Sequence, residues 1–161
     1  MRKALVGAFL MLAISSGVAS AQTDTNTITY SVSQVSLVDI AGNVTLAVTT
    51  GTAGSGLADA TANTTYAITN NYTSSGVKIT GSLNSAMPTG TTLTLAVTAP
   101  VASGTTSGVK TLTTTAQDLV TAIGAVNETG LNMAFTLTAT VSAGVISSAT
   151  KTLTLTLVNV T

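Results

Sequence analysis

The stretch that decides the fold is LNMAFTLTATVSAGVISSATKTLTLTLVNVT, residues 131–161. Apolar and polar side chains alternate through 131–141, and threonine alternates with leucine through 152–157. A period of two is typical of β-strands that have one apolar and one polar face. The small residues at 142–144 indicate a connection. We therefore expect the two runs to pair as a long hairpin whose apolar face is covered by the rest of the chain.

Shorter alternating runs of the same kind fill most of the preceding chain. The expected strands are 28–32, 35–37, 44–48, 65–70, 77–83, 93–97 and 109–113. The phase of the first run changes near Ser33 and Gln34, which indicates a bulge or a break between two strands. A turn over 39–43 would pair this region with 44–48 as a hairpin.

The intervening segments have the composition of loops and turns. Residues 51–63 are rich in Gly, Ala and Thr, which predicts a surface loop. Met87–Gly90 predicts a turn in which Pro88 fixes φ and Gly90 takes a positive φ.

One segment has a helical pattern instead. Thr115 offers a cap with Asp118 three residues later, the apolar residues up to Ile123 share one helical face, and Gly124 can end the turn. The predicted fold is therefore all-β, an antiparallel β-sandwich of immunoglobulin-like or pilin-like type, with one short helix. A parallel β-helix is the alternative, although no fixed-period repeat supports it.

The first 21 residues have the pattern of a signal peptide. Arg2 and Lys3 precede an apolar run, and Ala19-Ser20-Ala21 provides the small residues required for cleavage before Gln22. The run is too short for a permanent membrane anchor of about 20 residues. We expect a secreted, extracellular or cell-surface protein in which 22–161 forms a single β-sandwich domain.

The composition excludes several classes of partner and site. Only 6% of the residues are charged, against about a quarter in an ordinary soluble domain. After cleavage, three lysines and five acidic residues give a formal charge of −2. Without a basic patch, and with only four aromatic residues after Gln22, the chain is not expected to bind nucleic acid. Few charges protect the sheet edges, so self-association is expected.

Catalysis is not expected, and neither is a bound cofactor or metal. The sequence has no His, Cys or Trp, which removes most nucleophile and base pairs and the thiolate and imidazole metal sites. A Ser–Lys pair with Lys78, Lys110 or Lys151 is formally possible, but a solvated strand face explains these lysines better. The five acidic residues are scattered, which does not favour a glycosidase pair.

Two minor features remain open. Asp39 and Asn43 flank a glycine and could contribute to a calcium loop, although a turn that bonds its own backbone explains them better. N-x-[ST] triplets, which would matter only in a host that N-glycosylates exported proteins, begin at Asn43, Asn63, Asn71, Asn127 and Asn159.

The chain resembles exported β-sandwich subunits of prokaryotic surface fibres, such as chaperone-usher pilins and biofilm-matrix fibre proteins. The resemblance lies in the cleavable signal, the Thr-rich strands, the lack of catalytic residues, and the segments TYAITNN (65–71), GVKITGSL (76–83) and MAFTLTATVSA (133–143). It implies polymerisation by strand exchange. One departure is KTLTLTLVNV (151–160), which looks like a complete closing strand, whereas a chaperone-usher pilin lacks its last strand. Type IV pilins match less well, because they keep their apolar helix.

The leading hypothesis is a structural subunit of an extracellular fibre, pilus or surface layer that polymerises with copies of itself. Ile28, Tyr30 and Val32 are the strand-exchange candidates, because they alternate strictly close to the new N-terminus. The alternative is a monomeric secreted adhesin or a carbohydrate-binding β-sandwich module, with surface proteins or glycans as partners.

The signal peptide gives the first testable prediction. Protein isolated from its native host should have the intact mass of a chain that begins at Gln22, because signal peptidase cleaves after Ala21. A mass that includes residues 1–21 would contradict cleavage and remove the basis for an extracellular role.

Overall fold

The structure is a computed structural model that describes residues 22–74 and 76–160. The predicted signal peptide, 1–21, lies outside the described residues. Among the described residues, one compact body begins at Ser33, and residues 22–32 belong to a separate unit. The sheets and the core described below all belong to this body.

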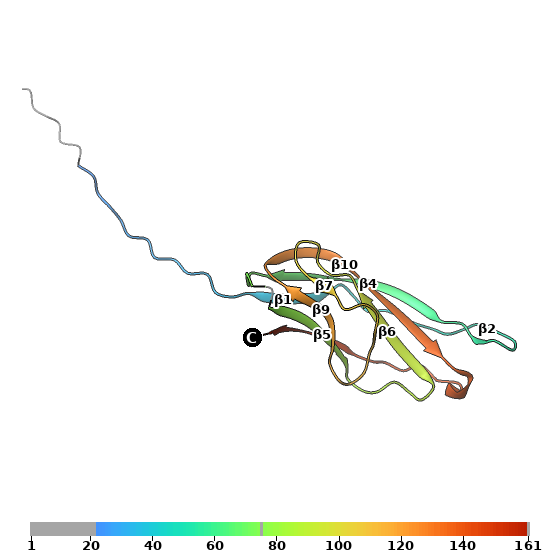
Figure 1. Ribbon diagram of the computed structural model, residues 1–161. Coiled ribbons are helices and arrows are strands. Elements are labelled where there is room, and N and C mark those ends of the chain that lie inside the picture. The colour runs from blue at the N-terminus through green and yellow to red at the C-terminus, as the bar shows by residue number, and fades with distance from the viewer. Residues whose placement is uncertain (1–21, 75, 161) are drawn as a thin grey trace, which may run out of the picture. The chain divides into compact units, whose positions relative to one another are not determined.

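The described residues contain eleven strands and one short 3₁₀ helix (Figure 1). The elements are β1 (Ser36–Ile40), β2 (Gly51–Thr52), β3 (Gly56–Leu57), β4 (Ala60–Asn70), β5 (Val77–Leu83), β6 (Thr91–Val97), β7 (Thr105–Thr106), β8 (Lys110–Thr111), β9 (Gln117–Ile123), β10 (Val126–Ala139), η1 (Val141–Ala143) and β11 (Leu153–Asn159).

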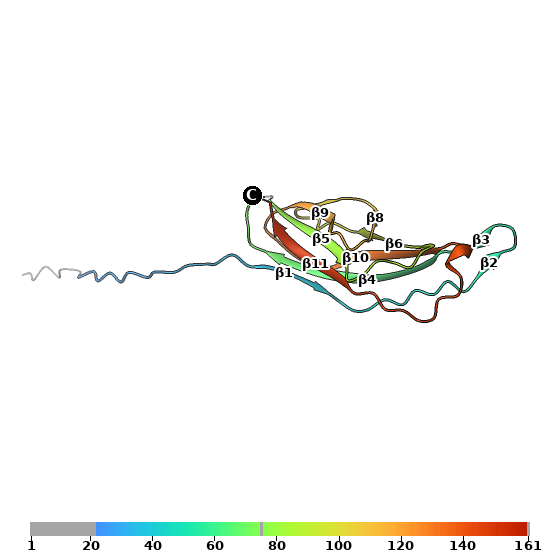
Figure 2. The same ribbon diagram turned by 90° about the horizontal axis from the view of Figure 1, so that it is seen from below.

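The strands form two main antiparallel sheets. A five-stranded sheet has the order β1-β4-β10-β6-β8, and a four-stranded sheet has the order β11-β5-β9-β7. β2 and β3 form a small hairpin of their own. Figure 2 shows the body from a second direction. Every strand pair is antiparallel, so the all-β prediction is confirmed and the parallel β-helix is wrong.

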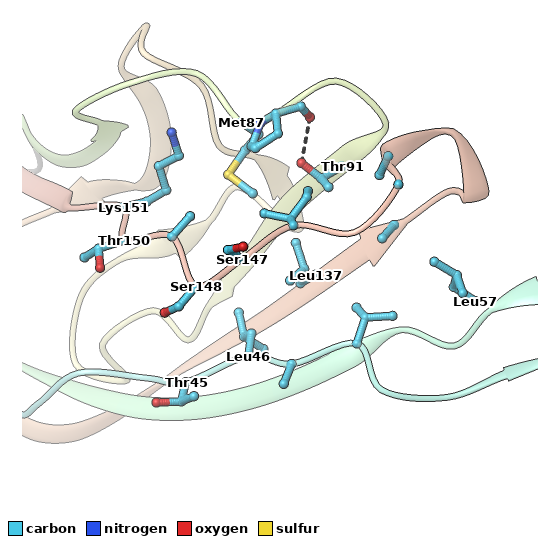
Figure 3. A pocket seen from close by; sticks show the side chains of 18 of the residues that line it. Thr45, Leu46, Leu57, Met87, Thr91, Leu137, Ser147, Ser148, Thr150 and Lys151 are labelled. Carbon is cyan, nitrogen blue, oxygen red and sulfur yellow. Dashed lines mark hydrogen bonds between the residues drawn. The ribbon is translucent and has the colours of Figure 1, made fainter.

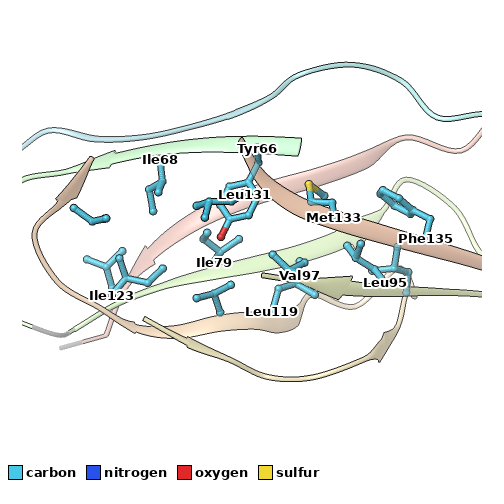
Figure 4. Packing of buried hydrophobic residues seen from close by; sticks show 14 of the residues in the cluster. Tyr66, Ile68, Ile79, Leu95, Val97, Leu119, Ile123, Leu131, Met133 and Phe135 are labelled. Atoms are coloured by element: carbon cyan, nitrogen blue, oxygen red, sulfur yellow. The ribbon is translucent and has the colours of Figure 1, made fainter. Parts of the chain in front are cut away.

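The central strand is β10, the predicted start of the hairpin. Met133 and Phe135 are buried, as the alternation predicted, while Thr138 on the other face is exposed. β10 pairs with β4 on one side and with β6 on the other. Its apolar face meets residues of the four-stranded sheet, including Ile79 and Leu119, in one hydrophobic core (Figure 4).

A bulge lets β10 keep its apolar residues inside although their phase changes. The register with β4 shifts between Glu128 and Leu131, and Gly130 has φ of 71°. Val126 before the bulge and Leu131 after it differ by an odd number of residues, yet both are buried. The extra residue re-aims the strand, and glycine adopts the positive φ without the steric cost of a Cβ.

The predicted hairpin between the two long runs is wrong. Both runs are strands, but β10 lies in the five-stranded sheet and β11 pairs with β5 in the other sheet, where Leu155 lies opposite Gly81. The connection from 140 to 152 is much longer than the loops of about 2–5 residues that join hairpins. It carries the chain from one sheet to the other.

The predicted helix over 115–123 is also wrong. This segment contains strand β9, and Leu119, Val120 and Ile123 are all buried. Its register with β5 shifts twice, and Ala122 has φ of 56°, so consecutive apolar residues can both face the core. These irregularities broke the period of two and produced a spacing that imitates one face of a helix.

Residues 35–63 differ from the predicted arrangement. Asp39 lies within β1 and not in a turn, and β1 pairs with β4, not with 44–48. Leu37 is exposed while Val38 and Ile40 pack against the core, because the register places them opposite Ile68 and Tyr66. The predicted loop over 51–63 is a β2–β3 hairpin followed by the start of β4.

The core gives the second prediction. Phe135→Ala should lower the free energy of unfolding by about 3–5 kcal/mol, because the side chain is only 6% exposed and its removal leaves a cavity. Thr138→Ala on the exposed face of the same strand should change it by less than about 0.5 kcal/mol. Denaturant unfolding measures both, and equal losses would mean that the faces of β10 are assigned wrongly.

Candidate functional site: a groove between two unpaired segments

The predicted strand-exchange residues lie in a segment without secondary structure. Residues 22–35 contain no strand. Ile28, Tyr30 and Val32 are 80%, 87% and 82% exposed. Three apolar side chains on alternate positions thus remain in water, a costly arrangement that a partner surface would relieve. Their role in strand exchange stays a prediction.

The compact body begins with a firm attachment at the end of β4. The Val35 amide donates to Asn71 Oδ1 at 2.8 Å, the Asn71 amide donates to the Val35 carbonyl at 3.1 Å, and Asn71 Nδ2 donates to the Ser33 carbonyl at 2.9 Å. This attachment fixes the point from which residues 22–32 leave the body.

The body contains a groove of about 620 Å³ (Figure 3). The residues that line it come from 44–48, from the turn before β6, from the end of β10, and from 143–151. Its apolar lining includes Val44, Leu46, Val48, Leu57, Met87, Leu137 and Ile146. Leu46 and Met87 point toward the space from opposite sides (Figure 3). Of the described residues in the lining, only Lys151 is charged.

One wall of the groove is the segment 44–48, which was predicted to be a strand. Its side chains alternate as expected, because Val44, Leu46 and Val48 are half-buried while Thr45 and Ala47 are exposed. Pairing with β4 ends at the bond from the Ala41 amide to the Thr65 carbonyl, and the next backbone bond joins the Ala58 amide, just before β4, to the Thr50 carbonyl. Between these two bonds, eight residues (42–49) run beside six (59–64), so this stretch is out of register with the opposing chain.

The opposite wall is the extended segment that leads into β11. Within the described residues, 145–150 forms no hydrogen bond in a strand ladder. Lys151 Nζ fixes its end by donating to Ser85 Oγ at 2.8 Å and to the Ala86 carbonyl at 2.7 Å. A Ser–Lys contact thus exists, and the same ammonium holds the loop before Met87 against the chain. We therefore assign Lys151 a structural role in the groove.

A tight turn supports one end of the groove. The Thr91 amide donates to the Pro88 carbonyl at 3.0 Å, and Gly90 has φ of 79°, as predicted for this turn. The Thr140 amide donates to the Gly90 carbonyl at 2.8 Å, so the turn is attached to the end of β10. Ala143, which lines the groove, lies against Gly90.

The other polar side chains outside the groove have structural contacts. Glu128 accepts hydrogen bonds from the Val101 and Ala102 amides at 2.9 and 2.8 Å. The Tyr66 hydroxyl donates to the Thr98 carbonyl at 2.7 Å. Burial, with a smaller contribution from Glu128, raises the pKa of Tyr66 above its ordinary value. The phenol therefore stays neutral and keeps this hydrogen bond.

The remaining predicted residues are dispersed. Lys78 forms an ion pair with Asp118 at 2.9 Å, and Lys110 lies on β8. Asp39 is exposed on β1, and the described residues contain no group of three or more His, Cys, Asp or Glu that could hold a metal ion. The asparagines of the N-x-[ST] triplets are all exposed: Asn43, Asn63, Asn71, Asn127 and Asn159.

Comparison with known proteins gives no relative. No family model, no curated protein and no solved structure matches the chain. Among the described residues there is no helix with the length and hydrophobicity that crossing a bilayer requires. The site must therefore be interpreted from its own geometry.

Sequence reasoning did not find the groove. The alternation over 44–48 predicts a hairpin strand, whereas the structure has no strand there. The opposite wall, 145–150, contains mainly small and polar residues and gives no strand signal. Since about a hundred residues separate the walls, only the fold brings them together.

The turn at the end of the groove gives the third prediction. Gly90→Ala should destabilise the body by at least about 1–2 kcal/mol, because an L-residue is strained at positive φ. The new Cβ would also lie 2.7 Å from the Ala143 nitrogen. Gly42→Ala is the control, since a Cβ there meets nothing within 4 Å. Thermal unfolding compares them, and an unchanged midpoint for Gly90→Ala would contradict this account of the turn.

Proposed function

We propose that this protein is a structural subunit of an extracellular fibre, pilus or surface layer, and that residues 22–32 join one copy to the next by β-strand exchange. The observation that supports the proposal is a segment outside the compact body that exposes Ile28, Tyr30 and Val32 on alternate positions. In this proposal the chain is exported, and its body is a β-sandwich of immunoglobulin-like or pilin-like type.

The energetics favour a partner that offers both an apolar surface and backbone hydrogen bonds. Burying each of the three side chains stabilises by about 1.5–3 kcal/mol. Ordering the backbone costs roughly 1–2 kcal/mol per residue, so side-chain burial alone is not sufficient. Addition to a sheet edge supplies ladder hydrogen bonds as well, as in β-strand addition.

A monomeric adhesin or carbohydrate-binding module is the second candidate. The observation in its favour is the groove of about 620 Å³, a size within the range of about 300–1,000 Å³ typical of ligand pockets. Its described lining contains no aromatic side chain, however, and aromatic rings are common in such pockets. This composition favours the fibre subunit.

The fourth prediction tests the fibre hypothesis. The chain that begins at Gln22 should form regular filaments in electron micrographs, and the double variant Ile28→Asp/Tyr30→Asp should not, because burying carboxylates in a partner is costly. The matched variant Thr27→Asp/Thr29→Asp carries the same charge on the alternate positions and should still form filaments.

Both variants should remain folded, because residues 27–30 lie outside the compact body. Circular dichroism and thermal unfolding of the monomer check this point. A wild-type chain that stays monomeric at all concentrations would favour the binding module. A double variant that cannot fold would place this segment in its own core.

A further inference from the structure

The groove described above has the features of an acceptor for the exchanged segment. Resting on the proposed fibre function, we infer that residues 25–32 of a second copy bind between 44–48 and 145–150. In this arrangement Ile28, Tyr30 and Val32 face the apolar lining, and the backbone pairs with a wall of the groove. The acceptor is thus a defined site at one end of the body.

The walls provide unused backbone hydrogen-bonding groups. Among the described residues, neither 43–49 nor 145–150 takes part in a backbone–backbone hydrogen bond, although 44–48 has the alternating burial of a strand. An extended chain with free N–H and C=O groups is a template for another strand. Water satisfies these groups in the isolated copy, and an incoming strand would replace it.

The incoming segment and the groove share one periodicity. Ile28, Tyr30 and Val32 occupy every second position, as do the half-buried Val44, Leu46 and Val48. In extended chains, residues two positions apart are separated by about 6.6–6.8 Å, so both sets span roughly 13 Å. Side chains of the incoming strand can therefore pack between those of the wall over the whole set.

Charge also favours this occupant. Residues 25–38 contain no charged side chain, and a neutral apolar segment suits a lining with a single charge. Asp24 precedes the segment, and Lys151 in the groove donates only to neutral oxygens among the described residues. A strongly charged peptide would lack partners in this lining.

The chain cannot fill its own groove. Val35 is attached to Asn71 at the carboxyl end of β4, whereas Leu137 in the groove lies opposite Ala60 at the other end. β4 has 11 residues, so its ends are about 33 Å apart. Val32 is three residues before Val35 and reaches at most about 11 Å from it. The three apolar side chains together therefore need the groove of another copy.

The exchanged segment and the groove lie at opposite ends of β4, and this placement favours growth into a filament. The segment leaves the body at one end of β4, and the groove lies at the other end. A contact between different surfaces of identical copies is heterologous, and it grows into an open filament when the rotation does not close. Each added copy would present a new empty groove.

Disulfide trapping tests the inference, since the chain has no cysteine. Copies with Tyr30→Cys are mixed with copies that carry Val44→Cys, Leu46→Cys or Val48→Cys, oxidised, and analysed by gel electrophoresis and mass spectrometry. A disulfide forms only when the two Cα atoms are about 4.4–6.8 Å apart. Three acceptor positions are therefore used, so that one of them lies within this distance whichever register the incoming strand adopts. The controls are Thr29→Cys as donor, and Thr45→Cys and the 92%-exposed Val101→Cys as acceptors.

We expect cross-linked pairs from Tyr30→Cys with at least one inward position, in at least about tenfold excess over the controls. Electron microscopy of the same samples separates the two proposals. Filaments without such an excess would overturn the groove as acceptor and leave the fibre function standing. Absence of both filaments and cross-links would overturn both. A disulfide within one chain that carries Tyr30→Cys and Leu46→Cys would overturn the exchange between copies.

Discussion

The inward face of β10 is the interaction on which the rest of the body depends. Met133 and Phe135 are buried between the two sheets, and the backbone of the same strand bonds β4 on one side and β6 on the other. No disulfide can support the fold in a chain without cysteine. Apolar burial and ladder hydrogen bonds must therefore supply the stability, and β10 provides both at the centre of the larger sheet.

Local alternation predicted strands but not their partners. The runs that became β5, β6, β10 and β11 were found because their inward residues recur every second position. Whether β11 pairs with β10 or with β5 depends on residues far away in sequence, such as Gly81 opposite Leu155. The prediction of a helix over the segment of β9 was wrong for a local reason. Bulges place Leu119 and Val120 on the same side of the strand, which breaks its period of two.

The exposed segment can be predicted from the sequence, whereas the groove cannot. The strict alternation of Ile28, Tyr30 and Val32 is a local signal and needs no tertiary information. One wall of the groove lies in a mismatched stretch, where eight residues after Ala41 run beside six of the opposing chain before the next backbone bond at Thr50. Such a mismatch is visible only once the register of β1 and β4 is known.

In the proposed fibre, folding and assembly would be separate steps. The hydrophobic core contains no residue of 22–32, so in this proposal a copy would fold alone and remain monomeric with an empty groove. Binding of a neighbour's segment would then stabilise only the folded state of the acceptor, by an amount that grows with the concentration of copies. A subunit built in this way would be more stable within a fibre than in dilution, although no residue of its own core changes.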